Sequence, residues 1–361
     1  MKKICLFLPS LRGGGAERVM LTLANGIAEK GYIVDLVLAK AEGPYLKDVS
    51  PKVNVIDLGA SRMLLSLLPF AKYLKKEKPD SILSAMSHVN IIAFLAKSLS
   101  GSKARLVFSE HNNLSTSSSV NKSHKTTLLK SLMSWAYKKA DVIVAVSNGV
   151  ADDLAEQINL SRPGIVTIYN PVVTSHLLEL KEEPLNHPWI QNDIPFIIGV
   201  GRLTAQKNFA LLIDAFNQLQ KKHDINLVVL GEGELEEELK TQIERLGLED
   251  KVLMPGFVDN PFPWMKHAKC FVMSSDFEGF GNVLAEAMAC GTPVVSTDCP
   301  SGPFEILEGG KWGKLVPVRN ESALADAIDE SLSSDIDTKS LEKRAKQFNT
   351  ENSLIQYLEI L

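Results

Sequence analysis

The sequence predicts an α/β protein with two Rossmann-like domains, each built on a parallel β-sheet. Short apolar runs of strand length alternate with helical segments along most of the chain, a pattern typical of parallel sheets covered by helices on both faces. Glycines gather where several of the expected strands give way to a helix. The length of 361 residues is sufficient for two domains of ordinary size.

The composition is that of a globular protein without membrane spans. Hydrophobic residues make up 45% and charged residues 23% of the chain, which are ordinary values for such proteins. No apolar run approaches the ~20 residues needed to cross a bilayer. The basic and apolar start resembles a secretory signal, but Pro9, Arg12 and three glycines end it early. We therefore expect a cytoplasmic protein. Four cysteines without C-x-x-C spacing are expected to be reduced and buried: Cys5, Cys270, Cys290 and Cys299.

The charges are divided unevenly along the chain. The formal net charge is −4, but residues 1–170 hold 22 Lys and Arg against 13 Asp and Glu, a net charge of +9. Residues 171–361 hold 17 basic against 30 acidic residues, a net charge of −13. This asymmetry favours two domains with different partners. Nucleic acid is not expected among them, because no basic tract with interleaved aromatic residues occurs.

The chain begins with a strand, a glycine turn and a helix. ICLFLPS is the strand, and LRGGGAER leads into a helix that ends at Gly31. Three adjacent glycines do not form the G-x-G-x-x-G fingerprint of dinucleotide-binding proteins, which argues against a nicotinamide cofactor. For each glycine, a structural role in a tight turn that packs the helix on the strand is as good an interpretation as a role in ligand binding.

Further strands follow in the first half, and His111 comes directly after one of them. Ligands of parallel sheets bind beyond the carboxyl ends of the strands, so His111 is a candidate site residue, although a lone histidine is more often structural. Ser147 stands where the N-cap of the next helix is expected. The expected strands are YIVDLVLA, VNVIDL, SILSA, ARLVFSE, DVIVAVS and IVTIY.

Two segments of the first half are apolar and basic together. Residues 61–78 and 122–139 place leucines, and in the second case a tryptophan, among lysines. The simpler interpretation is a pair of domain helices that each bury one apolar face. The alternative is contact with an anionic membrane surface, which helices of this kind can make.

A polar, proline-containing segment separates the halves, and FIIGVGR then begins a second parallel sheet, followed by the strands LVVLGEGE and VLMPGFV. Arg202 and Lys207 lie where FIIGVGR gives way to a helix. We place the boundaries at residues 1–172 for the N-terminal domain, 173–194 for the linker, 195–345 for the C-terminal domain and 346–361 for a last helix.

The stretch from Cys270 to Cys299 reads as strand, loop, helix and strand. CFVMSS and PVVSTD are the strands, and NVLAEAMA between them is the helix. The loop DFEGFG brings two glycines to the start of this helix, where unpaired N–H groups and a partial positive charge suit a phosphate. Glu278 lies in the loop and Glu286 in the helix, eight positions apart.

This stretch resembles the E-x7-E region of the retaining glycosyltransferases of the GT-B fold, family 4 in particular. The matching residues are Glu278, Glu286 and the string GTPVV after the helix, with further likeness in SLRGGGAER, SEHN and SGPFEIL. The resemblance implies two Rossmann-like domains that face each other across a cleft. The first would bind the acceptor and the second the nucleotide sugar, with the last helix crossing back onto the first domain.

The resemblance also implies roles for individual residues. Arg202 and Lys207 would neutralise the donor diphosphate, and Glu278 would bind sugar hydroxyls near the reacting carbon. With His111, which would touch the transferred sugar, these are the expected catalytic residues. The remaining donor-binding residues are Gly14 and Gly15 at the diphosphate (with Gly13 as a further candidate), Val258 at the base, Glu286 at the ribose, and Phe280, Gly281, Asn282 and Val283 around the helix start.

The expected reaction is retaining transfer of a hexosyl or N-acetylhexosaminyl group from a nucleotide sugar, with UDP-sugars favoured and GDP-mannose second. The acceptor would be a hydroxyl of a glycan, in particular a polyprenyl-diphosphate-linked sugar of surface polysaccharide or glycoconjugate assembly. Three alternatives remain at this point: a sugar-nucleotide epimerase of the same fold, a sugar-nucleotide sensor without activity and an NAD-dependent oxidoreductase.

No cofactor and no metal are expected. The tripeptide from Asp335 to Asp337 is a literal D-x-D, the metal motif of a different glycosyltransferase fold. It follows no strand, and a motif without its structural context is weak evidence. Cations supplied by the protein would take the place of a metal ion at the diphosphate.

Overall fold

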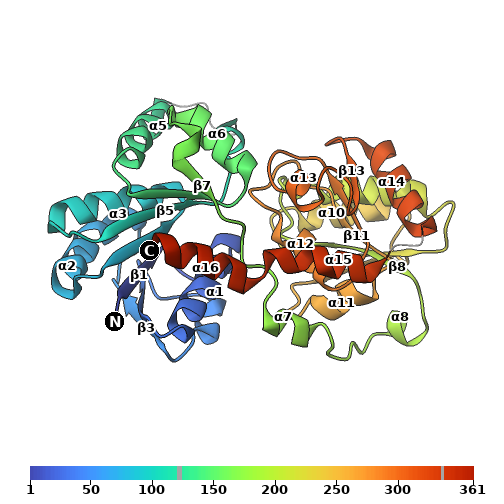
Figure 1. Cartoon of the computed structure of the whole chain (residues 1–361). Helices are drawn as coiled ribbons and strands as arrows, with labels where there is room; N and C mark the ends of the chain where they lie inside the picture. Colours follow the sequence, from blue (N-terminus) through green and yellow to red (C-terminus); the bar gives the residue numbers. More distant parts are fainter. Residues whose placement is uncertain (120–123, 335–336) are drawn as a thin grey trace. The chain divides into compact units, whose positions relative to one another are not determined.

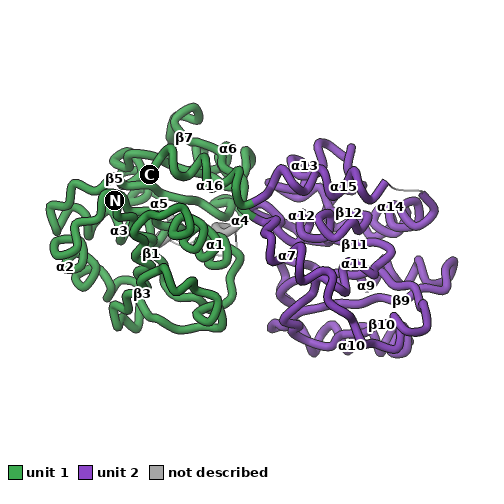
Figure 2. Tube along the Cα trace, turned by 60° about the horizontal axis from the view of Figure 1, so that its bottom comes forward, with its two compact units in different colours: residues 1–171, 350–361 green, residues 172–349 purple. Residues whose placement is uncertain are grey.

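Two units make up the chain in the computed structural model, which describes residues 1–119, 124–334 and 337–361. Unit 1 consists of Met1–Pro171 together with Thr350–Leu361, and unit 2 of Val172–Asn349 (Figure 2). Each unit contains a parallel β-sheet covered by helices. The predicted architecture of two Rossmann-like domains is therefore confirmed.

The described part of unit 1 forms a seven-stranded sheet in which all strands are parallel. The strands are rich in apolar residues because both faces of the sheet are covered. In β1, side chains alternate between the faces: Ile4 and Leu6 join the core under α1, while Phe7 stacks on Phe70 of α2 at 3.9 Å between ring centroids. In spatial order the strands are β3 (Val53–Asp57), β2 (Ile33–Leu38), β1 (Lys3–Leu8), β4 (Ser81–Ala85), β5 (Arg105–Glu110), β6 (Val142–Ala145) and β7 (Ile165–Thr167).

Helices connect these strands and cover the sheet (Figure 1). Ser147 caps α6 as predicted, since its Oγ accepts a hydrogen bond from the Val150 amide at 3.2 Å. The helices of unit 1 in the described residues are α1 (Gly15–Glu29), η1 (Pro44–Asp48), η2 (Met63–Ser66), α2 (Leu67–Glu77), α3 (Ser87–Ser100), α4 (Leu114–Ser119), α5 (His124–Tyr137), α6 (Asn148–Ile158), η3 (Arg162–Gly164) and α16 (Thr350–Ile360).

The last helix, α16, belongs to unit 1 although it follows unit 2 in the sequence. It lies beside α1, and its residues Leu354 and Tyr357 are part of the unit 1 core (Figure 1). Ser353 Oγ donates to the Tyr169 carbonyl at 2.8 Å, and the carbonyl of Leu361 accepts from Ser81 Oγ. These buried contacts fix the end of the chain on the sheet of unit 1.

Unit 2 contains a six-stranded parallel sheet. Apolar side chains of its central strands pack against α9 and α14 on one face. On the other face, Phe196 lies against Trp264 of α11 at 6.0 Å between ring centroids. In spatial order the strands are β10 (Val252–Gly256), β9 (Asn226–Leu230), β8 (Phe196–Val200), β11 (Cys270–Met273), β12 (Val294–Thr297) and β13 (Lys314–Val316).

The helices of unit 2 begin within the segment that we expected to be a linker. Residues 173–194 contain α7 and α8 and belong to unit 2. Thr174 and His187 cap these two short helices with their side chains. The helices described in unit 2 are α7 (Ser175–Leu180), α8 (Pro188–Gln191), α9 (Phe209–Leu219), α10 (Glu236–Leu246), α11 (Phe262–His267), α12 (Asn282–Ala289), α13 (Pro303–Ile306), α14 (Glu321–Ser333), α15 (Thr338–Ala345) and η4 (Lys346–Phe348).

The four cysteines are free and buried, as predicted. Burial raises the pKa of the Cys270 and Cys290 thiols to about 12, so neither is a reactive thiolate at neutral pH. Within the three described ranges, none of the helices is long and apolar enough to cross a bilayer.

Candidate active site

The loop between β11 and α12 carries Glu278 and the glycines of the predicted phosphate site. The stretch folds as expected into strand, loop, helix and strand. Gly281 is the N-cap of α12 and has φ of +93°, a conformation that side chains other than glycine rarely adopt. This glycine therefore allows the chain to turn from the loop into the helix.

Lys207 and Glu278 form a nearly buried ion pair at the carboxyl ends of the unit 2 strands. Lys207 Nζ lies 2.5 Å from Glu278 Oε1, and the two side chains are 16% and 9% exposed. Ser275 Oγ donates to the same carboxylate oxygen at 2.7 Å. Charges in such a position are costly unless they are paired. The pair connects the loop after β8 with the loop after β11, which lie far apart in the sequence.

A second set of contacts holds these two loops together. Asn208 has φ of +47° and caps α9 through the Leu211 amide. Its Nδ2 donates to Asp276 Oδ1 at 3.0 Å, and Arg319 donates to Asp276 Oδ2 from Nε at 2.9 Å and from Nη2 at 2.6 Å. These supporting contacts were not predicted from the sequence. The only signal was the position of Asn208, directly before a helix, where asparagine is a favoured cap.

Arg202 lies exposed in the turn after β8. This turn packs directly on the backbone of the loop after β9. A Cβ atom on Gly231 would lie 1.9 Å from the Gly201 carbonyl oxygen, and one on Gly233 would lie 2.3 Å from that of Leu203. The two glycines of the GEG sequence therefore allow this close approach, and they position the turn that carries Arg202.

The other predicted donor contacts lie around the start of α12 and after β10. Glu286 is buried within α12, and Asn282 and Val283 form its first turn. The ring of Phe280 is buried against Phe348 at 5.3 Å between centroids, so a ligand could reach only the main chain of Phe280. Val258 is partly buried and follows β10 by two residues.

In unit 1, the glycine turn binds a carboxylate of its own chain. The amides of Gly13 and Gly14 donate to Glu17 Oε2 at 2.9 and 3.1 Å, and Ser10 Oγ donates to Glu17 Oε1 at 3.3 Å. Gly14 is the N-cap of α1, and Gly15 is its first residue. The role of Glu17 was not predicted from the sequence, although the three-residue spacing from cap to glutamate is that of a capping box.

His111 is buried at the carboxyl end of β5. Its Nε2 lies 3.0 Å from Ser109 Oγ, which in turn lies 3.3 Å from the hydroxyl of Tyr357 in α16. Burial lowers the pKa of His111 to about 4, so the imidazole is neutral near pH 7. The ring can therefore take part in hydrogen bonds without carrying charge.

Glu110, next to His111, is the centre of a buried polar network. Ser87 Oγ donates to its Oε2 at 3.0 Å, and Asn90 Nδ2 donates to its Oε1 at 2.9 Å. The hydroxyl of Tyr137 bonds to the same Oε1. Burial raises the pKa of Glu110 to about 8, so the carboxyl group is mostly protonated at neutral pH. The network connects β5 with α3 and α5.

The D-x-D tripeptide lies largely outside the described residues, which exclude Asp335 and Ile336. Asp337 is described, and it is the N-cap of α15. Its carboxylate accepts from the amides of Lys339 and Ser340 at 3.1 and 3.3 Å. No group of three side chains able to hold a metal ion occurs among the residues that the structure describes.

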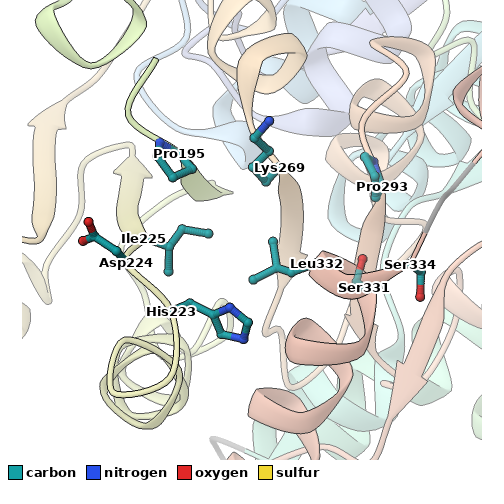
Figure 3. Close-up of a pocket in the computed structure, with 9 residues that line it drawn as sticks. All are labelled: Pro195, His223, Asp224, Ile225, Lys269, Pro293, Ser331, Leu332 and Ser334. Carbon is teal, nitrogen blue, oxygen red and sulfur yellow. The ribbon is translucent and has the colours of Figure 1, made fainter. Parts of the chain in front are cut away.

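A cavity of about 430 Å³ lies at the amino ends of the unit 2 strands, on the side of the sheet opposite the loops that carry Lys207 and Glu278. Pro195, Ile225, Lys269 and Pro293 line it, and each directly precedes a strand of the sheet. Figure 3 shows Ile225 and Leu332 facing each other across this space. Because ligands of parallel sheets bind at the carboxyl ends of the strands, this cavity is separate from the candidate active site.

Comparison with protein families gives two matches that together cover most of the chain. The model described as "Glycosyltransferase Family 4" matches residues 13–176. The model described as "Glycosyl transferases group 1" matches residues 184–348.

Similar sequences include a protein of Campylobacter jejuni that is 34% identical over 355 residues, or 96% of this chain and 94% of the relative. It is named N-acetylgalactosamine-N,N'-diacetylbacillosaminyl-diphospho-undecaprenol 4-alpha-N-acetylgalactosaminyltransferase. A lipopolysaccharide core biosynthesis glycosyltransferase of Rhizobium meliloti, LpsE, is 27% identical over 97% of this chain and 96% of its own.

Among solved structures, HepE of Anabaena in complex with UDP is similar with a TM-score of 0.79 and 23% identity, over 99% of both chains. Sucrose-phosphate synthase of Thermosynechococcus elongatus has a TM-score of 0.82 and 20% identity, over 99% of this chain and 98% of its own. At identities below 25%, this likeness shows the fold alone.

Proposed function

The chain belongs to glycosyltransferase family 4 of the GT-B fold, and we propose that it transfers a sugar with retention from a nucleotide sugar to a lipid-linked glycan. Glycosyltransferase activity follows from the family. The donor, the stereochemistry and the acceptor are our proposal. The observation that carries it is the Lys207–Glu278 pair beside the start of α12.

The proposed chemistry requires stabilisation of the departing nucleoside diphosphate. Negative charge develops on the diphosphate as its bond to the anomeric carbon breaks. Lys207 is held in place by its ion pair, Arg202 lies exposed in the same loop, and the amides from Gly281 to Val283 begin α12. Preorganised charges and dipoles of this kind stabilise a transition state without reorganising during the reaction.

Glu278 is better suited to binding sugar hydroxyls than to attacking the anomeric carbon. Its Oε1 is engaged by both Lys207 and Ser275, which lowers the nucleophilicity of the carboxylate. We therefore propose that the acceptor hydroxyl attacks from the side of the leaving group. The bond to the diphosphate breaks, the bond to the acceptor oxygen forms, and a phosphate oxygen of the donor takes the proton.

We propose a UDP-sugar as donor, with transfer of a hexosyl or N-acetylhexosaminyl group, and keep GDP-mannose as the second choice. Support comes from the Campylobacter jejuni relative, which is named as an N-acetylgalactosaminyltransferase, and from HepE, which has been solved with UDP. Binding of the donor needs no metal in this proposal, because cationic side chains and helix amides supply the counter-charge.

The proposed acceptor is a polyprenyl-diphosphate-linked sugar. Two relatives from Campylobacter jejuni carry undecaprenol-linked substrates in their names, and each of them matches over 96% of this chain. An acceptor of this kind is anchored in lipid, so we place the reaction at the cytoplasmic surface of a membrane. Neutral His111 would contact the transferred sugar from unit 1.

The experiment that tests this function measures nucleotide release from a panel of nucleotide sugars, with and without a polyprenyl-diphosphate-linked sugar. We expect release of UDP that depends on the acceptor, together with an acceptor product heavier by one sugar. Thermal-shift measurements with the same panel identify the donor, since ligand binding raises apparent stability. Conversion of the donor sugar without acceptor would identify an epimerase instead, and binding without turnover would identify a sensor.

A further inference from the structure

Three neighbouring leucines are exposed on unit 1 where the turn η2 leads into α2. Leu64, Leu65 and Leu68 are 69%, 58% and 71% exposed. Single exposed leucines are common on protein surfaces, but a contiguous apolar group on the surface indicates an interaction site. The leucines lie in one of the two segments, residues 61–78, whose composition is both apolar and basic.

These leucines do not pack into the core of unit 1. Other residues of the same segment attach the segment to the sheet. Phe70 and Leu74 are fully buried, and Tyr73 donates to the buried Asp35 at 2.6 Å. Ser66 is buried as well, with its Oγ donating to the Met63 carbonyl at 2.6 Å. The segment therefore has an inner apolar face, which packs on the sheet, and a separate outer one.

Basic side chains continue the outer face along α2. Leu68, Lys72 and Lys75 are four and three positions apart, so they share one face of the helix. From Arg62 to Lys76 the sequence contains no acidic residue. Lys72 and Lys75 are exposed and take part in none of the ion pairs found among the described residues. The charge of this face is therefore available to a partner.

We propose that this face, formed by Leu64, Leu65, Leu68, Lys72 and Lys75, docks unit 1 on an anionic membrane. The leucines enter the apolar boundary of the lipid, and the lysines contact anionic headgroups. An apolar cluster followed by unpaired lysines on one helix face suits a lipid surface, because such a surface offers both hydrocarbon and negative charge. The inference deepens the proposed function, since a lipid-linked acceptor is reached from the same surface.

The second apolar and basic segment, residues 122–139, is a weaker candidate. Residues 122 and 123 lie outside the described ranges. Trp135 is exposed, but its ring packs edge-on against Phe94 at 4.6 Å between centroids. Lys130 donates to Gln157 at 2.6 Å. Trp135 and Lys130 therefore already contact other side chains of unit 1, which makes this helix a weaker candidate for docking than the face that carries the three leucines.

Co-sedimentation of the full chain with vesicles tests the proposal without donor or acceptor, so its outcome is independent of the proposed reaction. We expect binding to vesicles of equimolar phosphatidylcholine and phosphatidylglycerol, and much weaker binding to phosphatidylcholine alone. The variant Leu64→Ser/Leu65→Ser/Leu68→Ser is expected to bind the anionic vesicles at least about tenfold more weakly, because burial of even one leucine is worth about that factor. High salt is expected to weaken binding of the unmodified protein.

Two further variants make the test specific. Lys72→Glu/Lys75→Glu is expected to reduce binding to anionic vesicles while UDP binding by thermal shift stays unchanged. Ile355→Ser is the matched control, because Ile355 is an exposed aliphatic residue, 49% exposed, in another helix of unit 1. This control is expected to bind vesicles like the unmodified protein.

Equal vesicle binding by the leucine variant and the unmodified protein would overturn the proposal, as would equal binding to neutral and anionic vesicles or binding to neither. Sedimentation equilibrium tests the alternative that a second copy of the chain binds to this face. Self-association that the leucine variant abolishes, combined with vesicle binding that it leaves unchanged, would identify an interface between two copies of the chain instead.

Discussion

Lys207 and Glu278 are the side chains on which transfer is expected to depend most. Their ion pair is nearly buried and lies beside the start of α12. We expect Glu278→Gln, and separately Arg202→Ala/Lys207→Ala, to lower kcat/KM by a factor of order 10² or more, since such groups stabilise developing charge. The measurement is acceptor-dependent release of UDP.

The control for these variants is Lys314→Ala, which removes an exposed ion pair with Glu330 in the same unit. Exposed pairs contribute little to stability, so this variant is expected to fold and to retain activity. Turnover near that of the unmodified protein in Glu278→Gln or in the double variant would show that the site lies elsewhere.

We predict that buried Glu110 makes the stability of unit 1 depend on pH. Its pKa is raised from 4.5 to about 8 by burial, so the folded state holds a proton that the unfolded state releases. The associated stability is fully present below pH 4.5 and is lost as the pH rises toward 8. Between pH 6.5 and 8 the loss is expected to be about 2 kcal/mol. In this window His111, with a pKa of about 4, does not titrate in the folded state.

Glu110→Gln is the variant that isolates this effect, because a neutral amide of the same shape replaces the protonated carboxyl group. Chemical denaturation at pH 6.5 and at pH 8 should show a smaller loss of unfolding free energy in the variant than in the unmodified protein. An equal loss in both proteins would assign the pH dependence to other groups.

At the residue scale, the family resemblance predicts Glu278, Lys207 and Arg202 as candidate site residues, and this remains a prediction. The sequence did not predict that Lys207 and Glu278 form an ion pair. The ion pair between Lys207 and Glu278 depends on two loops held together by Asn208 and Asp276. Loop conformations of this kind are determined by tertiary hydrogen bonds, which leave no periodic signal in the sequence.

Among the elements, the turn after β8 depends on close packing against a glycine of another loop. Gly231 has φ of +139°, and a Cβ atom there would lie 1.9 Å from the Gly201 carbonyl oxygen. Gly231→Ala is therefore expected to displace the turn that carries Arg202. Small misplacements of catalytic groups are costly, so we expect kcat/KM to fall by a factor of order 10 to 100.

Gly247→Ala is the matched control for that prediction. Gly247 also has positive φ, +65°, but a Cβ atom there meets nothing within 4 Å. This variant is expected to lose about 1 kcal/mol of stability from backbone strain and to keep its activity. If both glycine variants were equally active, the close packing of the β9 loop on the Arg202 turn would have no catalytic role.

At the element scale, hydrophobic periodicity predicted the strands well, because buried parallel strands appear as continuous apolar runs. The short helices α7 and α8 were missed, since a polar segment with two prolines gives no amphipathic pattern. Prolines at the start of a helix are compatible with it, and Pro188 is the first residue of α8.

For the molecule as a whole, we predict that transfer requires no metal ion, because the protein supplies the positive charge itself. The donor diphosphate is expected to be neutralised by Arg202, Lys207 and the amides at the start of α12. Activity should therefore persist in EDTA at the level measured without it. Loss of activity on chelation, with recovery on adding Mn²⁺ or Mg²⁺, would contradict this assignment.

The uneven charge of the chain is visible in the sequence, but only the structure shows which basic side chains are exposed to a partner. The first half is basic, and the structure leaves Lys72 and Lys75 exposed beside three leucines. Periodicity alone could not distinguish a helix with one buried face from a helix with a second, outer apolar face. That distinction depends on which side of α2 the sheet covers.

The proposed reaction moves a sugar from a nucleotide sugar to a lipid-linked glycan with retention. The most direct measurement is NMR of the purified product, read at the anomeric coupling constant of the new linkage. An α-linked UDP-sugar is expected to give an α-linked product on the polyprenyl-diphosphate-linked acceptor. A β-linked product, or release of the free sugar without a new linkage, would rule out the proposed retaining transfer.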